Sequence, residues 1–373
     1  MTIYIDVSAA VHAKAGIGRY ASSLAQALVA QEPGRFALFY NRVAGSRPPA
    51  GLGSIPARTV RAGYKPWRMA VWAGQVARVS FDRLVPGAKL FHATEHLLLP
   101  LRDIPTVLTI HDMIFALFPE HQKRLNYWYL NATMPLYCQR ASAIVTVSQS
   151  SKRDIVALYD VEPDKVSVIY EAAAPGFRPV SREQARATGE RYGLPDHYLV
   201  HVGTIEPRKN LTRLVEALQL LHEQGLTIPL VVVGGKGWLY EGFFQRLEDL
   251  EIQDRVHFPG YVADADLPAL YQGATAAVAP SVYEGFGLPV LEAMACGTPV
   301  LASHVSSLPE LGGDAARYFD PYSTEDIAHA IRSVWSDNDL QAEMSQAGQA
   351  QAAKFSWAQA AKETLSVYER LLL

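Results

Sequence analysis

Two glutamates eight positions apart, Glu284 and Glu292, frame the segment of this chain that is best suited to binding a ligand. Between them, Gly285 and Gly287 permit close approach of the backbone and dihedral angles that other residues avoid, and Pro289 suits the first turn of a helix. We therefore expect Glu284 in a loop and Glu292 one turn inside a helix that ends by Gly297. The free amides at such a helix start attract anions, and a carboxylate can accept hydrogen bonds from both hydroxyls of a diol. Glu284 therefore suits a sugar, the amides at the helix start suit a diphosphate, and Glu292 suits a ribose. The alternative interpretation is a strand-to-helix turn with two solvated glutamates.

A second candidate lies at Glu206-Pro-Arg-Lys-Asn210, which precedes a helical pattern that Asn210 is expected to cap. Arg208 and Lys209 stand beside the start of that helix, where cations are unfavourable for the helix itself. A bound diphosphate would explain them, because guanidinium and ammonium groups donate strong hydrogen bonds to phosphate. A solvated basic loop is the alternative.

Two weaker motifs occur in the first half of the chain. Gly16-Ile-Gly18 precedes a helical pattern from Arg19 to Ala30, and in a loop it would let a phosphate or sugar approach the backbone; a simple tight turn is the alternative. His111 follows an apolar strand pattern, and the neighbouring Asp112 would orient its ring as carboxylates do for functional histidines. A histidine that only makes structural hydrogen bonds is the other interpretation.

The pattern of the whole chain predicts two α/β domains with parallel sheets. Short β-rich runs alternate with helical patterns in both halves, which is typical of βαβ units flanked by helices. In such sheets ligands bind beyond the carboxyl ends of the strands, where all four motifs fall. The best linker is Ala172–Pro179, where proline and glycine interrupt the periodicity. The expected strands are 3–7, 36–40, 90–92, 106–110, 143–147 and 166–169, then 198–202, 229–233, 256–258, 276–279, 299–302 and 316–319.

Composition excludes several classes of protein. With 373 residues, 49% of them hydrophobic and 19% charged, the chain is expected to be globular, and it has no apolar run long enough to span a bilayer. Its first residues read as a strand rather than a signal peptide. Cys138 and Cys296 are the only cysteines, which rules out a disulfide framework and suggests a reducing compartment.

Charge is distributed unevenly along the chain. Residues 1–170 hold 19 Lys and Arg against 11 Asp and Glu, whereas residues 171–373 hold 15 against 26. Much of the basic excess lies between Arg58 and Arg83, among Trp67, Trp72 and Phe81. Basic and aromatic residues together can mark a helix that lies on an anionic membrane, and a solvated helix with buried tryptophans is the alternative. Peripheral membrane contact is therefore a hypothesis; nothing predicts nucleic-acid binding.

The segment from Glu284 to Glu292 resembles the E-x7-E motif of the retaining glycosyltransferases of family 4. The resemblance covers nearly the whole chain, with matching pieces at 16–20, 110–112, 203–210 and the C-terminal tail. It implies the GT-B fold: two Rossmann-like domains facing each other across a cleft, with the last helix crossing back to the first domain. The implied boundaries are 1–174 plus about 356–373 for an acceptor domain, and 175–355 for a nucleotide-sugar-binding domain.

The resemblance also implies roles for the candidate residues. Glu284 binds hydroxyls of the transferred sugar, Glu292 binds the ribose, and Arg208 and Lys209 hold the donor diphosphate. His111 reaches the transferred sugar. Some relatives carry an arginine directly after the strand glycine, where this chain has Thr204. The remaining expected donor contacts, mostly through the main chain, are Gly16, Gly18, Gly203, Thr204, Gly234, Tyr261, Gly285, Phe286, Gly287 and Leu288.

The resemblance is strongest to bacterial mannosyltransferases of polysaccharide and lipid-linked oligosaccharide assembly, which favours GDP-mannose as donor and a glycan or lipid-linked acceptor. UDP-glucose and dTDP-rhamnose stay open as donors. Phosphorylase or epimerase activity and a non-catalytic, sugar-nucleotide-binding scaffold are the alternatives. We expect a cytoplasmic protein, and its location at the inner face of the cell membrane is part of the membrane-contact hypothesis. We expect no separate cofactor. We also expect no metal, because Asp264-Ala-Asp266 and Asp337-Asn-Asp339 read as helix caps and turns rather than metal ligands.

Overall fold

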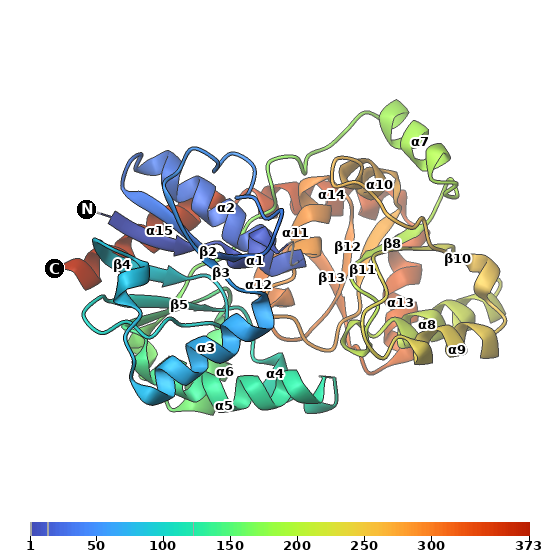
Figure 1. Ribbon diagram of the computed structural model, residues 1–373. Coiled ribbons are helices and arrows are strands. Elements are labelled where there is room, and N and C mark those ends of the chain that lie inside the picture. The colour runs from blue at the N-terminus through green and yellow to red at the C-terminus, as the bar shows by residue number, and fades with distance from the viewer. Residues whose placement is uncertain (1, 13–14, 122) are drawn as a thin grey trace. The chain divides into compact units, whose positions relative to one another are not determined.

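The computed structural model describes residues 2–12, 15–121 and 123–373, and the chain folds into two compact units. The first unit comprises Met1–Glu171 and Ser356–Leu373, and the second comprises Ala172–Phe355. Each unit is a parallel sheet with helices on its faces (Figure 1).

The first unit contains a seven-stranded sheet in the order β3-β2-β1-β4-β5-β6-β7. Its apolar strands pack against helices through a continuous core that includes Phe39, Phe91 and Ile144. Its strands are β1 (Thr2–Asp6), β2 (Phe36–Arg42), β3 (Ala57–Arg61), β4 (Ala88–Ala93), β5 (Thr106–Ile110), β6 (Ala143–Thr146) and β7 (Val166–Val168). Its helices are α1 (Ser8–Val11), α2 (Ala15–Gln31), α3 (Tyr64–Ala77), α4 (Ile114–Leu117), α5 (Arg124–Arg140), α6 (Gln149–Tyr159) and α15 (Trp357–Leu372), with short 3-10 helices η1 (Asp82–Leu84), η2 (Pro119–His121) and η3 (Pro163–Lys165).

The second unit contains a six-stranded sheet in the order β10-β9-β8-β11-β12-β13, the order of a classic dinucleotide-binding fold. Its strands are β8 (Leu199–Val202), β9 (Leu230–Val233), β10 (Val256–His257), β11 (Ala276–Ala279), β12 (Val300–Ser303) and β13 (Ala316–Phe319). Its helices are α7 (Arg182–Arg191), α8 (Leu211–Glu223), α9 (Glu241–Asp249), α10 (Leu267–Gly273), α11 (Leu288–Ala295), α12 (Leu308–Gly312), α13 (Thr324–Trp335) and α14 (Asn338–Ala352), with η4 (Pro207–Lys209), η5 (Gln253–Arg255) and η6 (Gly313–Ala315).

All twelve strands expected from the sequence are present, with ends that differ by at most two residues. Strand β3 was missed because it is an edge strand whose residues are almost all exposed, so it lacks the apolar run that marks a buried strand. In the sequence, Arg58 and Arg61 belong to the basic and aromatic segment that was interpreted as a helix, whereas the structure places them on β3.

The C-terminal helix α15 belongs to the first unit and packs beside α2, seen as the red helix next to the blue one in Figure 1. Ser356 caps this helix by accepting a hydrogen bond from the amide of Gln359. Tyr368 is buried in the unit, and its hydroxyl lies 2.6 Å from Nδ1 of His92. The last helix is therefore part of the first unit's core.

Trp67 and Trp128 have different surroundings. Trp67 is buried and stacks on Phe81, so this part of α3 fits the alternative of a helix with a buried tryptophan rather than an interfacial aromatic belt. On α5, Trp128 is 71% exposed. Of these two rings, the exposed one therefore lies on α5, not on α3.

Candidate active site

In the second unit, the loops that follow β8 and β11 meet because these two strands are neighbours at the switch point of the sheet. The amide of Val282 donates to the carbonyl of Arg208 at 2.9 Å. Asn210 has a left-handed φ of 56° and makes no side-chain cap, contrary to the expectation that it caps α8. Its amide nitrogen instead donates to the carbonyls of Pro280 and Pro321. Asn210 thus fastens the two loops together.

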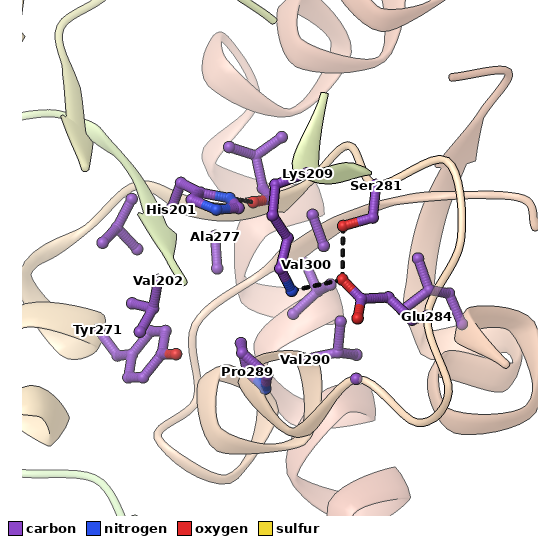
Figure 2. A pocket seen from close by; sticks show the side chains of 15 residues that line it. His201, Val202, Lys209, Tyr271, Ala277, Ser281, Glu284, Pro289, Val290 and Val300 are labelled. Carbon is purple, nitrogen blue, oxygen red and sulfur yellow. Dashed lines mark hydrogen bonds and ion pairs between the residues drawn. The ribbon is translucent and has the colours of Figure 1, made fainter. Parts of the chain in front are cut away.

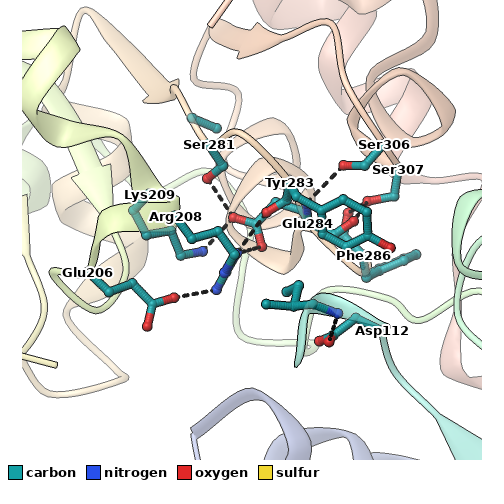
Figure 3. A network of polar contacts seen from close by, with 12 residues as sticks. Asp112, Glu206, Arg208, Lys209, Ser281, Tyr283, Glu284, Phe286, Ser306 and Ser307 are labelled. Carbon is teal, nitrogen blue, oxygen red and sulfur yellow. Dashed lines mark hydrogen bonds and ion pairs between the residues drawn. The ribbon is translucent and has the colours of Figure 1, made fainter. Parts of the chain in front are cut away.

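Glu284 lies at the centre of a buried cluster of charged residues on these loops (Figure 3). Lys209 Nζ and Ser281 Oγ both donate to Oε1 of Glu284, each at 2.6 Å. Arg208 Nη1 donates to Oε2 at 2.6 Å, while its Nη2 donates to Glu206 at the same distance. The sequence placed these residues at one site but did not predict that both cations would bind the same carboxylate.

The environment of Glu284 keeps its side chain ionised. Burial opposes ionisation, but the charges of Arg208 and Lys209 and the hydrogen bonds outweigh it and lower the pKa of Glu284 to about 2. For Glu206, burial is the largest effect and raises the pKa. Glu284 is therefore a carboxylate at neutral pH, held by two positively charged donors.

The turn from Glu284 to Leu288 leads into α11 as predicted, and two serines fix its shape. Ser306 accepts from the amide of Glu284 at 2.8 Å, and Ser307 donates to the carbonyls of Glu284 and Phe286. Gly287 has φ 113°, and a Cβ there would lie 2.8 Å from Leu308, so only glycine fits without a shift. These contacts fix the shape of the turn that leads into the start of α11, where free backbone amides favour an anion.

Glu292 lies inside α11, as predicted, and is almost fully buried. The hydroxyl of Tyr271 donates to it over 3.4 Å. The prediction that the two glutamates occupy a loop and a helix, with Pro289 in the first turn and Gly297 just beyond the end, is confirmed. Their binding roles remain predictions.

His201 is a site residue that the sequence pattern did not identify. It is a buried residue of β8 and lines the same pocket as Lys209 and Glu284 (Figure 2). Its Nδ1 lies 3.0 Å from the carbonyl of Val278, so Nδ1 must carry the proton. Burial, aided by the charge of Lys209, lowers the pKa of His201 to about 4, which leaves the ring neutral. Nε2 is buried and makes no hydrogen bond with the described residues, so it presents a lone pair within the pocket. In the sequence, His201 occupies an ordinary strand position.

The glycines after β8 and β9 pack against each other. A Cβ on Gly234 would lie 2.0 Å from the carbonyl oxygen of Gly203, and one on Gly237 would lie 2.6 Å from the side chain of Thr204. These glycines are therefore needed for loop packing, whether or not a nucleotide also approaches them. Tyr261, expected near the base, is 88% exposed.

In the first unit, the expectation for Gly16 and Gly18 is wrong in its local structure. Helix α2 begins at Ala15, so both glycines lie in its first turns rather than in a preceding loop. A Cβ on Gly18 would lie 3.0 Å from the carbonyl oxygen of Ala9, which shows that α1 and α2 approach closely at this point. Gly16 is exposed, and a Cβ there would meet no atom within 4 Å. Only Gly16 is placed where a ligand could reach it.

His111 is buried at the end of β5, but Asp112 does not orient its ring. Its Nε2 donates to the carbonyl of Thr94 at 2.9 Å, and its Nδ1 lies 3.5 Å from Glu171. Asp112 instead accepts from the amide of Ile114, which starts α4. Burial would lower the pKa of His111, but the hydrogen bond and charge of Glu171 outweigh it and raise the pKa. The sequence named the wrong carboxylate because Glu171 is 60 residues away.

Other residues near His111 have mainly structural contacts. His92 lies within β4 and contacts Tyr368 and Thr109 through its two ring nitrogens. Glu95 accepts from the hydroxyl of Tyr64 at 3.1 Å. His92 is therefore a core residue of this unit.

The two Asp-x-Asp segments have the local positions expected of helix starts. Asp337 caps α14 by accepting from the amide of Leu340. Asp266 occupies the cap position of α10 but binds Arg191 and the hydroxyl of Tyr192 rather than a helix amide. Within the described part of the chain, no three His, Cys, Asp or Glu side chains gather as a metal-binding group.

Together, the two parallel, dinucleotide-binding-type sheets define the GT-B fold. Residues 15–174 match the family described as Glycosyltransferase Family 4, and residues 189–351 match Glycosyl transferases group 1. The chain is 36% identical over 276 residues to the O-antigen chain mannosyltransferase B of Escherichia coli, covering 73% of this chain and 72% of that protein. It belongs to the family 4 glycosyltransferases and is a retaining hexosyltransferase.

A further relative agrees with this family, and solved structures share the fold. The O-antigen chain mannosyltransferase RfbU of Salmonella typhimurium is 29% identical, with 66% of this chain and 65% of that protein covered. The fold is similar to that of a sucrose-phosphate synthase from Thermosynechococcus elongatus, with a TM-score of 0.79 at 21% identity, covering 100% of this chain and 99% of that one. The fold is also similar to that of WaaG, a glycosyltransferase involved in lipopolysaccharide biosynthesis, with a TM-score of 0.72 at 17% identity. That match covers 98% of this chain and 99% of the other.

Proposed function

We propose that this protein transfers mannose from GDP-mannose to a glycan or lipid-linked acceptor during assembly of a surface polysaccharide. The observation that carries the proposal is the 36% identity to a mannosyltransferase that extends an O-antigen chain. The second unit binds the donor and the first unit binds the acceptor. Incubation with GDP-mannose, UDP-glucose and dTDP-rhamnose, followed by chromatography of the released nucleotide, tests the donor. Faster acceptor-dependent release from either of the other two donors than from GDP-mannose would refute mannose transfer.

The charged cluster supports a mechanism based on exchange of ion-pair partners. Departure of the nucleoside diphosphate concentrates negative charge on its phosphates, and fixed cations near them lower the barrier. Arg208 and Lys209, now bound to Glu284, would turn part of their hydrogen bonding towards the diphosphate. Glu284 would then accept hydrogen bonds from hydroxyls of the sugar. The amides of Gly287 and Leu288 complete the contacts to the leaving group, and the acceptor attacks from the same face of the sugar, which retains the anomeric configuration.

Glu292 is proposed to bind the ribose diol of the donor. Its burial in α11 supports this role, because a buried carboxylate strongly favours hydrogen-bond donors around it. The test compares GDP with 2′-deoxy-GDP by titration calorimetry, on wild type and on Glu292→Gln. We expect wild type to bind the deoxynucleotide about tenfold more weakly, as for one lost hydrogen bond to a charged group, and the variant to show a smaller difference. An equal difference in both proteins would exclude this contact.

The reaction is proposed to need no metal. Arg208 and Lys209 supply the positive charge that Mg²⁺ supplies in enzymes with an Asp-x-Asp pair, and Asp337 is engaged as a helix cap. Activity should therefore persist in excess EDTA. Loss of activity in EDTA with recovery on adding Mg²⁺ would refute this point.

We propose further that the first unit touches an anionic membrane, which would place a cytoplasmic enzyme beside a lipid-linked acceptor. Within the described chain, no helix is both long and apolar enough to cross a bilayer. On α5, Leu125 is 87% exposed and Trp128 is 71% exposed, directly after Lys123 and Arg124, a combination suited to an interface. Flotation with liposomes of phosphatidylcholine and phosphatidylglycerol tests the contact, with Trp128→Ala expected to float less than wild type and Leu239→Ala expected to match it. Full retention of wild type in the unbound fraction would refute it.

A further inference from the structure

Besides the pocket beside Glu284, the structure has a hollow in the first unit. The hollow lies at the amino-terminal end of β5, whereas His111 follows the carboxyl end of that strand. It is open to solvent and is lined by residues from the end of α3, the loop before β5 and the end of α5. Thr106, the first residue of β5, belongs to its lining, whereas His111 directly follows the last residue of the same strand. At about 3.3 Å per residue, the two places are about 16 Å apart. The hollow is therefore separate from the site at the carboxyl ends of the strands.

Three arginines line this hollow, namely Arg78, Arg102 and Arg140, and no acidic residue does. Among the described residues, none of the three makes an ion pair. Arg140 donates from Nη1 to the backbone carbonyl and to Oε1 of Gln75, the latter at 2.6 Å, so it is held in place by a neutral partner. Gln75 is itself fixed, because its amide donates to the carbonyl of Leu98 at 2.8 Å. The guanidinium of Arg140 is thus oriented without its charge being neutralised.

Asp82, on the same loop region, is used by the backbone. One of its oxygens accepts from the backbone amide of Arg102 at 3.1 Å, and the other accepts from the hydroxyl of Ser80. Asp82 therefore fixes the backbone that carries Arg102. Asp103 follows Arg102 in the chain but does not line the hollow, so the lining itself carries three positive charges and no negative charge.

The floor of the hollow is rigid. The amide of Phe81 donates to the carbonyl of Pro100 at 2.8 Å, and the amide of Val79 donates to the carbonyl of Gly74 at 2.9 Å. A Cβ on Gly74 would lie 3.0 Å from both Phe81 and Pro100, so the helix and the loop are in close contact. At the rim, Val79 is 53% exposed. The hollow thus presents the oriented guanidinium of Arg140 and two further exposed arginines beside an apolar residue.

We infer that this hollow binds the phosphate or diphosphate group of a ligand other than the nucleotide-sugar. Guanidinium groups match phosphate oxygens with paired hydrogen bonds. The guanidinium of Arg140 is already oriented by Gln75, so it loses little conformational entropy on binding. The phosphate can come from a soluble molecule or from a lipid whose chain lies over Val79. This inference is independent of which sugar is transferred.

The test compares the double variant Arg78→Gln/Arg102→Gln with the matched control Arg58→Gln/Arg61→Gln, which removes two exposed arginines of β3 in the same unit. Arg140 is left intact because of its bonds to Gln75. Inorganic pyrophosphate is titrated by calorimetry into both variants and wild type, and melting temperatures confirm folding. The Arg208–Lys209 cluster, present in all three proteins, contributes equally. We expect pyrophosphate binding at the hollow to be lost, or its affinity to fall at least tenfold, only in the Arg78/Arg102 variant.

A second arm identifies the source of the phosphate. The same proteins are floated with phosphatidylcholine vesicles that contain phosphatidic acid or, as a control, no anionic lipid. Loss of vesicle binding specific to the Arg78/Arg102 variant assigns the site to a lipid headgroup, and a pyrophosphate effect alone assigns it to a soluble ligand. If the two double variants behave alike towards both pyrophosphate and vesicles, the inference is wrong.

Discussion

Lys209 donates from Nζ to Oε1 of Glu284 over 2.6 Å, although the two residues are 75 positions apart in the chain. Both side chains are buried, and a buried charge is costly unless it is paired and hydrogen-bonded. Arg208 satisfies the other oxygen of Glu284, so one carboxylate fixes the positions of two cations. A ligand that takes over these cations must also offer hydrogen-bond donors to Glu284, and a sugar diphosphate provides both functions.

Replacing Lys209 with alanine is expected to lower turnover by about 10²-fold or more. One fixed charge at the leaving group contributes about 3 kcal/mol to stabilising the transition state. Arg208 and Ser281 still hold Glu284, so the variant is expected to fold, which circular dichroism checks. Lys354→Ala, which removes an exposed lysine of the same unit, serves as the control and should be unaffected. Turnover of the Lys209 variant within twofold of wild type would contradict the proposed role.

Because Glu284 is ion-paired in the folded protein, we expect the free energy of unfolding to depend on pH in the acid range. The pKa of this group falls from an ordinary 4.5 to about 2 on folding, so its contribution is complete above pH 4.5 and disappears as the pH approaches 2. The contribution is on the order of 3 kcal/mol at neutral pH. Glu284→Gln should therefore differ from wild type in free energy of unfolding at pH 7 more than at pH 3, measured with urea. The exposed Glu248→Gln provides the control, and an equal difference at both pH values would exclude the mechanism.

The contact between His111 and Glu171 predicts the titration of the histidine. Because Glu171 raises the pKa of His111, Glu171→Gln should lower it, as measured by NMR of the imidazole. The raised pKa adds stability below pH 6.5, and this gain is lost as the pH rises through the folded-state value. Asp112→Asn, whose carboxylate binds a backbone amide instead, should shift the pKa less. A larger shift in the Asp112 variant would restore the interpretation made from the sequence.

Gly16 and Gly18 should respond oppositely to alanine. At Gly18 the new methyl group would lie 3.0 Å from the carbonyl oxygen of Ala9, so Gly18→Ala should reduce stability by about 1–3 kcal/mol. At Gly16 the space is open, and alanine favours a helix by up to about 1 kcal/mol. Thermal unfolding measures both effects. If the backbone at Gly16 approaches the substrate, Gly16→Ala should also lower kcat/KM while the melting temperature rises; unchanged kinetics would reject that approach.

The sequence predicted the strands and the Glu284–Glu292 segment well, because both depend on local signals. Buried parallel strands appear as apolar runs, and the start of α11 is marked by glycine and proline. The strand β3 had no such signal, since its residues face solvent. The start of α2 was missed because glycine at 16 and 18 normally indicates a loop, whereas Gly18 is required here by the contact with α1.

The contacts within the site could not be predicted in the same way. Lys209, Glu284 and His201 come together only because β8 and β11 are neighbours in the sheet, and the sequence does not specify strand order. Likewise, Glu171, which contacts His111, is the last residue of the N-terminal segment of the first unit. Local patterns identified which segments carry chemistry, but the pairing of acids with bases depends on tertiary structure.

The first unit is built from both ends of the chain, and this has a consequence for how the protein is made. Until Ser356–Leu373 leaves the ribosome, the nascent first unit lacks α15, and His92 lacks the hydroxyl of Tyr368. The second unit, whose segment is continuous, can mature earlier during synthesis. A chain that terminates prematurely before α15 would thus carry a finished second unit joined to a first unit with an uncovered core, and would be a natural target for proteolysis.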